Sequence, residues 1–268
     1  MSKDFLVEIG TEELPPKALR SLMEAFGANL ATGIDDARLA HGDVQTYASP
    51  RRLAVLVESL AAAQKDRKVE QKGPPVSVAF DDDGNPKPAA TAFAARCGVA
   101  VDELERAQTD KGEWLVFNTV EEGKAAAELL PDIIERALAA LPIPRRMRWG
   151  AGDAEFVRPV HWVVLLHGKA LIDASIMGIR AGRDSRGHRF HSSGAVPITK
   201  PGSYLKELEQ DGYVIAVFAR RRGMVREGVE EAAQQAGGNI VDGESLYDEV
   251  ASLVEWPVPI VGAFDEVY

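Results

Sequence analysis

The order of strand-like and helix-like stretches limits the folds open to this chain more than any other feature. Residues 4–9 (DFLVEI) are typical of a short strand. Over 16–31, apolar residues recur at i, i+3, i+4 and i+7, which predicts an amphipathic helix that starts with prolines. Residues 44–48 and 52–58 then predict two strands joined by a tight, proline-containing turn.

The second half of the chain continues in the same irregular way. A helix is expected over 125–141, two apolar strands over 156–167 and 170–179, a further strand at 213–218 and a long helix over 219–236. Strands and helices do not alternate as they do in βαβ units. The pattern therefore predicts an α+β fold with mixed or antiparallel sheets and packed helices.

Prolines and polar stretches in the sequence predict where this fold divides. Pro142 and Pro144 end a helix, so we expect two lobes, an N-terminal α+β lobe over 1–141 and a second α+β lobe over 142–268. Residues 61–75 are polar and end in Gly-Pro-Pro, which favours a linker.

Two further expectations concern the middle and the end of the chain. A short helix is expected at 101–107. The last residues, 264–268, follow an apolar run directly, which is typical of a cut inside a longer polypeptide.

Charge is distributed unevenly along the sequence. The 268 residues carry a net charge of −10, yet residues 141–226 hold 15 lysines and arginines against 7 acidic residues, a net of +8. An acidic whole argues against indiscriminate nucleic-acid binding. The basic segment either binds a polyanion on one surface or supplies ion-pair partners for the acidic residues in the rest of the chain. Counting charges does not decide between these alternatives.

Composition also limits the cellular compartment in which we expect this protein. With one cysteine, Cys97, the chain forms no intrachain disulfide and no cysteine-rich zinc site. No signal peptide is evident, and the apolar runs are too short to span a bilayer. We therefore expect a cytoplasmic protein that does not enter a membrane.

Common catalytic signatures are missing from the sequence. It contains no phosphate-binding loop, dinucleotide turn or nucleophile elbow. His188 and His191 are three residues apart but stand in a glycine-rich stretch that reads as a loop, so we predict no metal site. Glu12 and Glu13 precede a helix, where we expect them to act as N-terminal charge. No catalytic residue is predicted.

Clustered arginines are the stronger signal. The clusters are Arg51 and Arg52; Arg145, Arg146 and Arg148 beside Trp149; Arg180, Arg183, Arg186 and Arg189 in a loop with His188; and Arg220, Arg221, Arg222 and Arg226. Guanidinium groups match phosphate oxygens, and aromatic rings stack on unpaired bases, so the clusters are candidates for RNA contacts. Ion pairing between domains or subunits is the alternative. The run at 220–222 opens a helix, where its charge opposes the helix dipole, and it needs a partner outside that helix.

Several segments together carry a family resemblance. They are FLVEIGTEELPPKALR (5–20), SPRRLAV (49–55), TDKGEWL (109–115), LPIPRRMRWG (141–150), FVRPVHWVVLL (156–166), RGHRF (186–190) and EVASLVEWPV (249–258). In this order they resemble the N-terminal part of the β subunit of bacterial glycyl-tRNA synthetase, across nearly the whole chain.

The resemblance implies a function and partners. In that α2β2 family the α subunit binds ATP and glycine and makes the adenylate, while the β subunit binds and positions tRNA(Gly). This chain is then part of a glycine–tRNA ligase, inactive alone, with no cofactor of its own; ATP and Mg²⁺ belong to the α subunit. Its partners are the α subunit and tRNA(Gly), with neither DNA nor a membrane. The helical and anticodon-binding domains of the family's β chain are absent from this sequence.

The site residues implied by this reading are those of three clusters. We expect phosphate contacts from Arg51, Arg52, Arg145, Arg146, Arg148, Arg186 and Arg189, and polar or stacking contacts from His188 and Trp149. In the alternatives, the stretch 145–149 docks a lobe or the α subunit, and the chain is an assembly scaffold with little tRNA contact. A hydrolytic, editing-like module is the third possibility.

Overall fold

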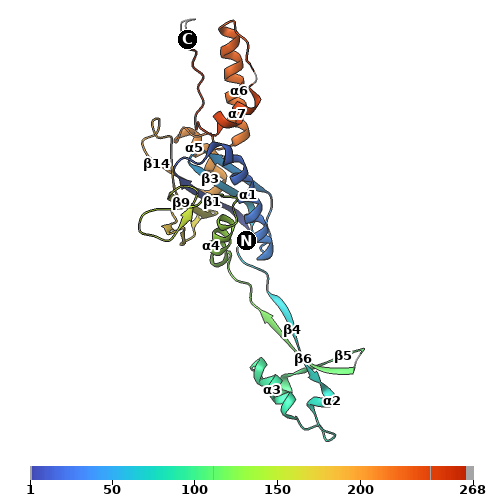
Figure 1. Ribbon diagram of the computed structural model, residues 1–268. Coiled ribbons are helices and arrows are strands. Elements are labelled where there is room, and N and C mark those ends of the chain that lie inside the picture. Colours follow the sequence, from blue (N-terminus) through green and yellow to red (C-terminus); the bar gives the residue numbers. More distant parts are fainter. Residues whose placement is uncertain (1, 111, 242, 264–268) are drawn as a thin grey trace. The chain divides into compact units, whose positions relative to one another are not determined.

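The computed structural model in Figure 1 describes residues 2–110, 112–241 and 243–263. The chain forms two compact units: unit 1 (Met1–Ala63 and Ala125–Tyr268) and unit 2 (Gln64–Lys124). Unit 2 is thus an insertion into unit 1. The predicted division at 141 and 142 falls inside unit 1, and the expected features of 264–268 lie outside the described residues.

A five-stranded sheet explains why the structure divides the chain elsewhere. Its strand order is β10-β9-β1-β3-β2, and every pairing is antiparallel. The strands are β1 (Lys3–Thr11), β2 (Val44–Ser49), β3 (Arg52–Leu60), β9 (Val160–His167) and β10 (Ala170–Leu171). Because β1 pairs with β9, residues on both sides of the proline-rich stretch build one sheet, and this pairing unites the two expected lobes.

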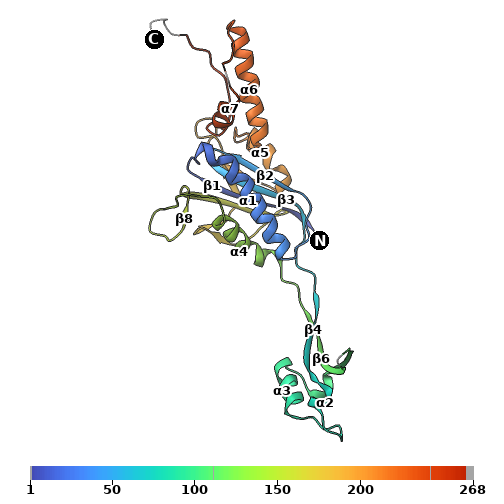
Figure 2. The same ribbon diagram turned by 45° about the vertical axis from the view of Figure 1, so that its right-hand side comes forward.

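Helices cover one face of this sheet. They are α1 (Pro16–Asp36) and α4 (Ala126–Ala139), which lie side by side in Figure 2. Alternate residues of β1, such as Phe5 and Val7, pack with Phe26 of α1 and Ile134 of α4 in one buried cluster. The period of two in the strand and of 3.6 in the helices places these side chains on facing surfaces. The helices predicted at 16–31 and 125–141 are confirmed.

The opposite face of the sheet is also buried. The covering elements are β13 (Asp184–Arg186), β14 (Ala195–Pro197) and α5 (Tyr204–Gln210), with the 3₁₀ turn η2 (Pro201–Ser203) leading into α5. Leu6 of β1 packs there with Val196 and Tyr204. Because both faces are covered, β1 reads as a nearly continuous apolar run, in which Glu8 is the exception.

The remaining elements of unit 1 are short strands and two C-terminal helices. They are β7 (Met147–Arg148), β8 (Glu155–Phe156), β11 (Ser175–Ile176), β12 (Ile179–Arg180), α6 (Phe218–Gln235) and α7 (Glu244–Ala251). Residues 213–217 form no strand, contrary to the prediction. They are apolar because Val214 and Ala216 are buried in the core without belonging to a strand. The Ile215 amide donates instead to the Glu255 carbonyl at 3.0 Å.

Unit 2 has a small core of its own, around Phe93 and Leu115. Its elements are β4 (Arg67–Pro75), α2 (Val76–Ala79), α3 (Pro88–Cys97), η1 (Val101–Glu103), β5 (Glu105–Thr109) and β6 (Gly112–Glu121). The predicted linker at 61–75 is largely β4, and the predicted helix at 101–107 is divided between the 3₁₀ turn η1 and the first residues of β5. Both errors have one cause: β6 lies between these two polar strands and pairs with each. No described helix is long and apolar enough to cross a membrane.

Candidate functional site

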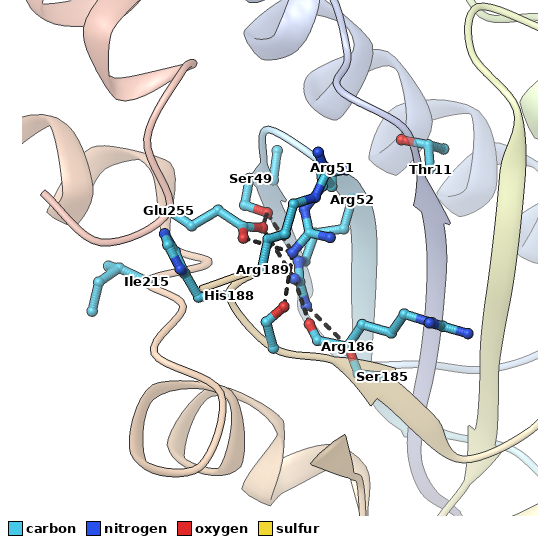
Figure 3. Close-up of polar contacts among 12 residues, drawn as sticks. Thr11, Ser49, Arg51, Arg52, Ser185, Arg186, His188, Arg189, Ile215 and Glu255 are labelled. Carbon is cyan, nitrogen blue, oxygen red and sulfur yellow. Dashed lines mark hydrogen bonds and ion pairs between the residues drawn. The ribbon is translucent and has the colours of Figure 1, made fainter. Parts of the chain in front are cut away.

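A network of buried charges lies at the β2–β3 turn. Arg52 has no exposed surface, and its guanidinium lies between two carboxylates: Glu8 Oε2 at 3.6 Å and Glu255 Oε1 at 3.1 Å. It also donates to the hydroxyls of Ser49 at 2.9 Å and Ser185 at 3.0 Å. Figure 3 shows Arg52 between Glu255 and Ser185. The network joins β1, β3, β13 and the segment after α7, which are distant in sequence.

Gly10 makes room for the aromatic neighbour of this network. In the sheet register Gly10 lies opposite both Trp162 of β9 and Arg52 of β3. A Cβ added at Gly10 would lie 1.9 Å from Trp162 Cε2, so the indole ring occupies the space above this glycine. The indole N–H donates to Glu8, and the Arg52 guanidinium lies 5.8 Å from the ring centroid. Tyr204 donates its hydroxyl to the other oxygen of Glu8.

Burial and mutual attraction set the protonation of this network. Burial alone would lower the pKa of Arg52, but the carboxylates of Glu8 and Glu255 outweigh it and raise that pKa. Burial alone would raise the pKa of Glu255, yet the guanidinium groups of Arg52 and Arg51 lower it below the ordinary value of 4.5. Burial raises the pKa of Tyr204 well above its ordinary value. The carboxylate of Glu255 and the guanidinium of Arg52 therefore stay charged at neutral pH.

Acid is expected to destabilise unit 1 through Glu255. Between the lowered folded-state pKa and the unfolded value near 4.5, the unfolded chain binds more protons, so stability rises with pH in that window. The stabilisation is complete above the unfolded pKa and is lost as pH falls through the folded one. Urea unfolding at a series of pH values between about 3 and 7 measures this. In Glu255→Gln the acid-side slope is expected to become shallower; an unchanged slope contradicts the assignment.

A polar pocket of about 380 Å³ opens where β1 ends. Its basic residues come from two segments distant in sequence: Arg51 from the β2–β3 turn, and Arg186, His188 and Arg189 from the end of β13 and the loop after it. All four are residues predicted to contact RNA. Arg186 is exposed, and its guanidinium lies 5.7 Å from the centroid of the Trp162 ring.

Internal contacts hold the other predicted residues of this pocket. Arg51 donates to the Gly187 carbonyl at 2.7 Å and to Glu255 Oε2 at 3.0 Å, and its side chain is 11% exposed. The His188 ring stacks on that of His191 with centroids 4.4 Å apart. Partial burial, reinforced by the charges of His191 and Arg51, lowers the pKa of His188, which keeps its ring neutral at pH 7. Arg52, which is also predicted to contact RNA, does not line the pocket and has no exposed surface for a ligand.

The second predicted cluster, 145–149, lies outside this pocket and has mixed roles. Arg146 donates to the Ala139 carbonyl at 2.7 Å and so caps the C-terminus of α4. Trp149 is half-buried against the main core. Arg145 and Arg148 are exposed, and Arg148 lies 3.8 Å from the fully exposed Asp153. Of this cluster, only Arg145 and Arg148 extend into solvent.

The arginine run at the start of α6 has the outside partners that helix electrostatics requires. Arg220 pairs with Glu209 at 2.5 Å, and Arg222 pairs with Glu244 at 2.7 Å and with Asp248. Arg221 is fully buried and donates to backbone carbonyls, among them that of Ala48 at 2.8 Å. Burial lowers the pKa of Arg221 to about 10, so it still carries its charge at neutral pH. These contacts make the run structural.

Sequence reasoning missed two residues of the pocket, Glu12 and His161. Glu12 Oε1 lies 3.0 Å from His161 Nε2, and Glu12 Oε2 accepts from Arg189 at 3.1 Å. The expected role of Glu12 as helix charge is wrong, because α1 begins at Pro16 and has no acidic residue in its first turn. No local pattern reveals the pairing, since the partners lie about 150 and 177 positions away.

Comparison with known proteins adds independent evidence. The family model described as "Glycyl-tRNA synthetase beta subunit" matches residues 5–268. The chain is 52% identical over 266 residues to the glycine–tRNA ligase beta subunit of Marinobacter nauticus, covering 99% of this chain and 38% of that protein. Identity is 52% to the beta subunit of Citrobacter koseri, with 99% and 39% covered, and 49% to that of Hahella chejuensis, with 98% and 38% covered.

The extent of these matches defines what they establish. The chain spans about two fifths of the length of the curated relatives that it matches, while nearly all of its own residues take part. The seven segments singled out in the sequence lie inside the matched region. This chain belongs to the glycyl-tRNA synthetase β-subunit family.

Proposed function

We propose that this chain binds tRNA(Gly) and positions it for the α subunit of a glycine–tRNA ligase, which attaches glycine with the use of ATP. Family membership supports the reaction, and the pocket supports the role. The observation that carries the role is the convergence of Arg51, Arg186, His188 and Arg189 on one pocket in a chain of net charge −10. A local cationic site in an acidic protein favours one oriented contact with a polyanion over indiscriminate binding.

The division of labour follows from the same proposal. The α subunit supplies ATP, Mg²⁺ and the adenylate chemistry, and this chain binds no cofactor and is inactive alone. The protein acts in the cytoplasm, with the α subunit and tRNA(Gly) as partners and without DNA or a membrane. The exposed Arg145 and Arg148 provide a second, smaller set of candidate phosphate contacts.

Removing two exposed arginines of the pocket tests the proposal. Arg186→Ala with Arg189→Ala is expected to weaken tRNA(Gly) binding on the order of tenfold, because two phosphate contacts are lost. The slope of log affinity against log salt concentration should become shallower by about 1.4–1.8. Fluorescence anisotropy across a salt series, with tRNA(Gly) and a non-cognate tRNA, measures both.

The matched control removes two exposed arginines elsewhere in unit 1. Arg20→Ala with Arg226→Ala changes the net charge equally but leaves the pocket intact. It is expected to keep the affinity and the slope near those of the parent chain. If both double variants bind tRNA alike, the pocket is not the contact. A pull-down with the α subunit then tests the scaffold role, which predicts that the pocket variant loses α binding while tRNA binding is retained.

A further inference from the structure

The pocket contains one group that does not suit a site for phosphate alone. Glu12 is the single carboxylate among its described lining residues, which include three arginines. Its charge repels a phosphate, and its oxygens attract a hydrogen-bond donor. A surface that only attracts phosphate gains from this residue no more than the orientation of Arg189. The pocket therefore combines two chemistries, one for an anion and one for a donor.

The geometry of Glu12 leaves acceptor capacity for a ligand. Oε1 is within hydrogen-bond distance of His161 Nε2, Oε2 accepts from Arg189, and the carboxyl group of Glu13 is also within hydrogen-bond reach. A carboxylate offers about four lone-pair positions, so these contacts leave at least one for a ligand. The side chain is 42% exposed. These contacts hold the carboxylate at the pocket wall and leave acceptor capacity for a ligand.

The ionisation of Glu12 restricts the kind of group that it binds. Slight burial alone would raise its pKa, but the hydrogen bond from Arg189 and the charges of His161 and Arg189 outweigh it and lower the pKa. At neutral pH the group is therefore ionised and only accepts. It suits a hydroxyl or an amino group and does not suit a phosphate oxygen.

A ribonucleotide carries both kinds of group that the pocket requires. Its phosphate suits Arg186, whose side chain forms no ion pair within the described part of the chain. Its 2′-hydroxyl is a donor, and this hydroxyl is what lets a protein distinguish RNA from DNA. The volume of about 380 Å³ lies near the lower end of ligand pockets, which favours one unpaired nucleotide over a duplex.

We propose that this pocket holds one unpaired ribonucleotide of the bound RNA, with its phosphate at Arg186 and its 2′-hydroxyl donating to Glu12. Glu12 is then the residue that selects RNA over DNA. The inference rests on the proposed function, because it takes RNA as the ligand. It adds which chemical feature of the RNA this pocket reads and which side chain reads it.

Glu13 provides a matched control in the neighbouring position. Its Oε1 lies 3.2 Å from Arg189 Nη2, so it shares this ion-pair partner with Glu12, but it does not line the pocket. Replacing either residue with alanine removes one negative charge and one partner of Arg189. Both variants are expected to attract phosphate somewhat better, for the same electrostatic reason. Only loss of Glu12 removes the acceptor of the sugar hydroxyl.

The experiment compares two oligonucleotides that differ only in the 2′-hydroxyl. The probes are fluorescein-labelled oligouridylate and oligodeoxyuridylate of ~10 nucleotides, a length typical of single-strand sites. Anisotropy at low salt gives the ratio of the two affinities for the parent chain, Glu12→Ala and Glu13→Ala. We expect about a tenfold preference for RNA in the parent chain and in Glu13→Ala, and a ratio near 1 in Glu12→Ala.

Each outcome supports or overturns one of the two proposals. Loss of the preference in Glu12→Ala alone supports the role of Glu12. Equal binding of RNA and DNA by the parent chain, or the same change of ratio in both variants, overturns that role and leaves the proposed function standing. Failure of the parent chain to bind oligouridylate at low salt overturns the single-nucleotide site, whereas failure to bind tRNA(Gly) in the salt series overturns the proposed function itself. Circular dichroism of each variant confirms that the comparison is made between folded proteins.

Discussion

Arg52→Ala is expected to lower the free energy of unfolding of unit 1 by about 3–5 kcal/mol, because it removes the guanidinium that two buried carboxylates share. Glu8 has no exposed surface and Glu255 is 5% exposed, so water does not replace the lost guanidinium. Glu8 would keep its neutral donors, and Glu255 would keep Arg51. Urea denaturation followed by circular dichroism measures the change.

A surface ion pair provides the contrast for this prediction. Arg20 pairs with Glu24 at 3.0 Å, and both side chains are more than half exposed. Solvent screens such a pair, so Arg20→Ala is expected to leave the stability unchanged within error. If Arg52→Ala behaves like Arg20→Ala, the buried network does not stabilise the β2–β3 turn in the way described.

Gly10→Ala is expected to be the second severe substitution, at about 3 kcal/mol, although it adds one methyl group. The new Cβ would lie 1.9 Å from Cε2 of Trp162, so the indole ring must move. The ring is 7% exposed, and its N–H is bonded to Glu8, so its displacement also removes a donor from a buried carboxylate. Thermal or urea unfolding detects the loss.

Two further variants test the cause of this effect. A Cβ at Gly223 in α6 meets no atom within 4 Å, so Gly223→Ala is expected to be neutral or slightly stabilising. Combining Gly10→Ala with Trp162→Phe, which removes the bulky part of the ring, is expected to cost less than the sum of the single changes. Additive costs contradict a clash between residue 10 and the indole.

Local patterns in the sequence predicted the elements of the central sheet and its helical cover. The strands β1, β2 and β3 and the helices α1 and α4 appear where apolar periodicity places them. Each buries a continuous apolar face, so the period of its own residues specifies it. The predicted strand at 213–218 is wrong because buried apolar residues without regular structure carry the same signal as a short strand.

Pairing between distant segments was beyond local patterns. The polar stretches that became β4 and β5 are strands because β6 hydrogen-bonds to both. The expected boundary at 141 and 142 disappears because β9 adds to β1. In each case the deciding partner lies elsewhere in the chain, and no window of neighbouring residues contains it.

For the site, the sequence by itself determined the family and the arginine clusters, because both depend on residue identity and order. Only the tertiary structure decided what each arginine does. Arg51 and Arg52 are neighbours in sequence but have different roles. Arg51 lines the pocket, whereas Arg52 is buried between carboxylates. Glu12 joined the pocket through His161 and Arg189. Burial and charge partners depend on which segments meet in space, and two of the partners, Glu255 for Arg52 and Arg189 for Glu12, lie more than 100 residues away in the chain.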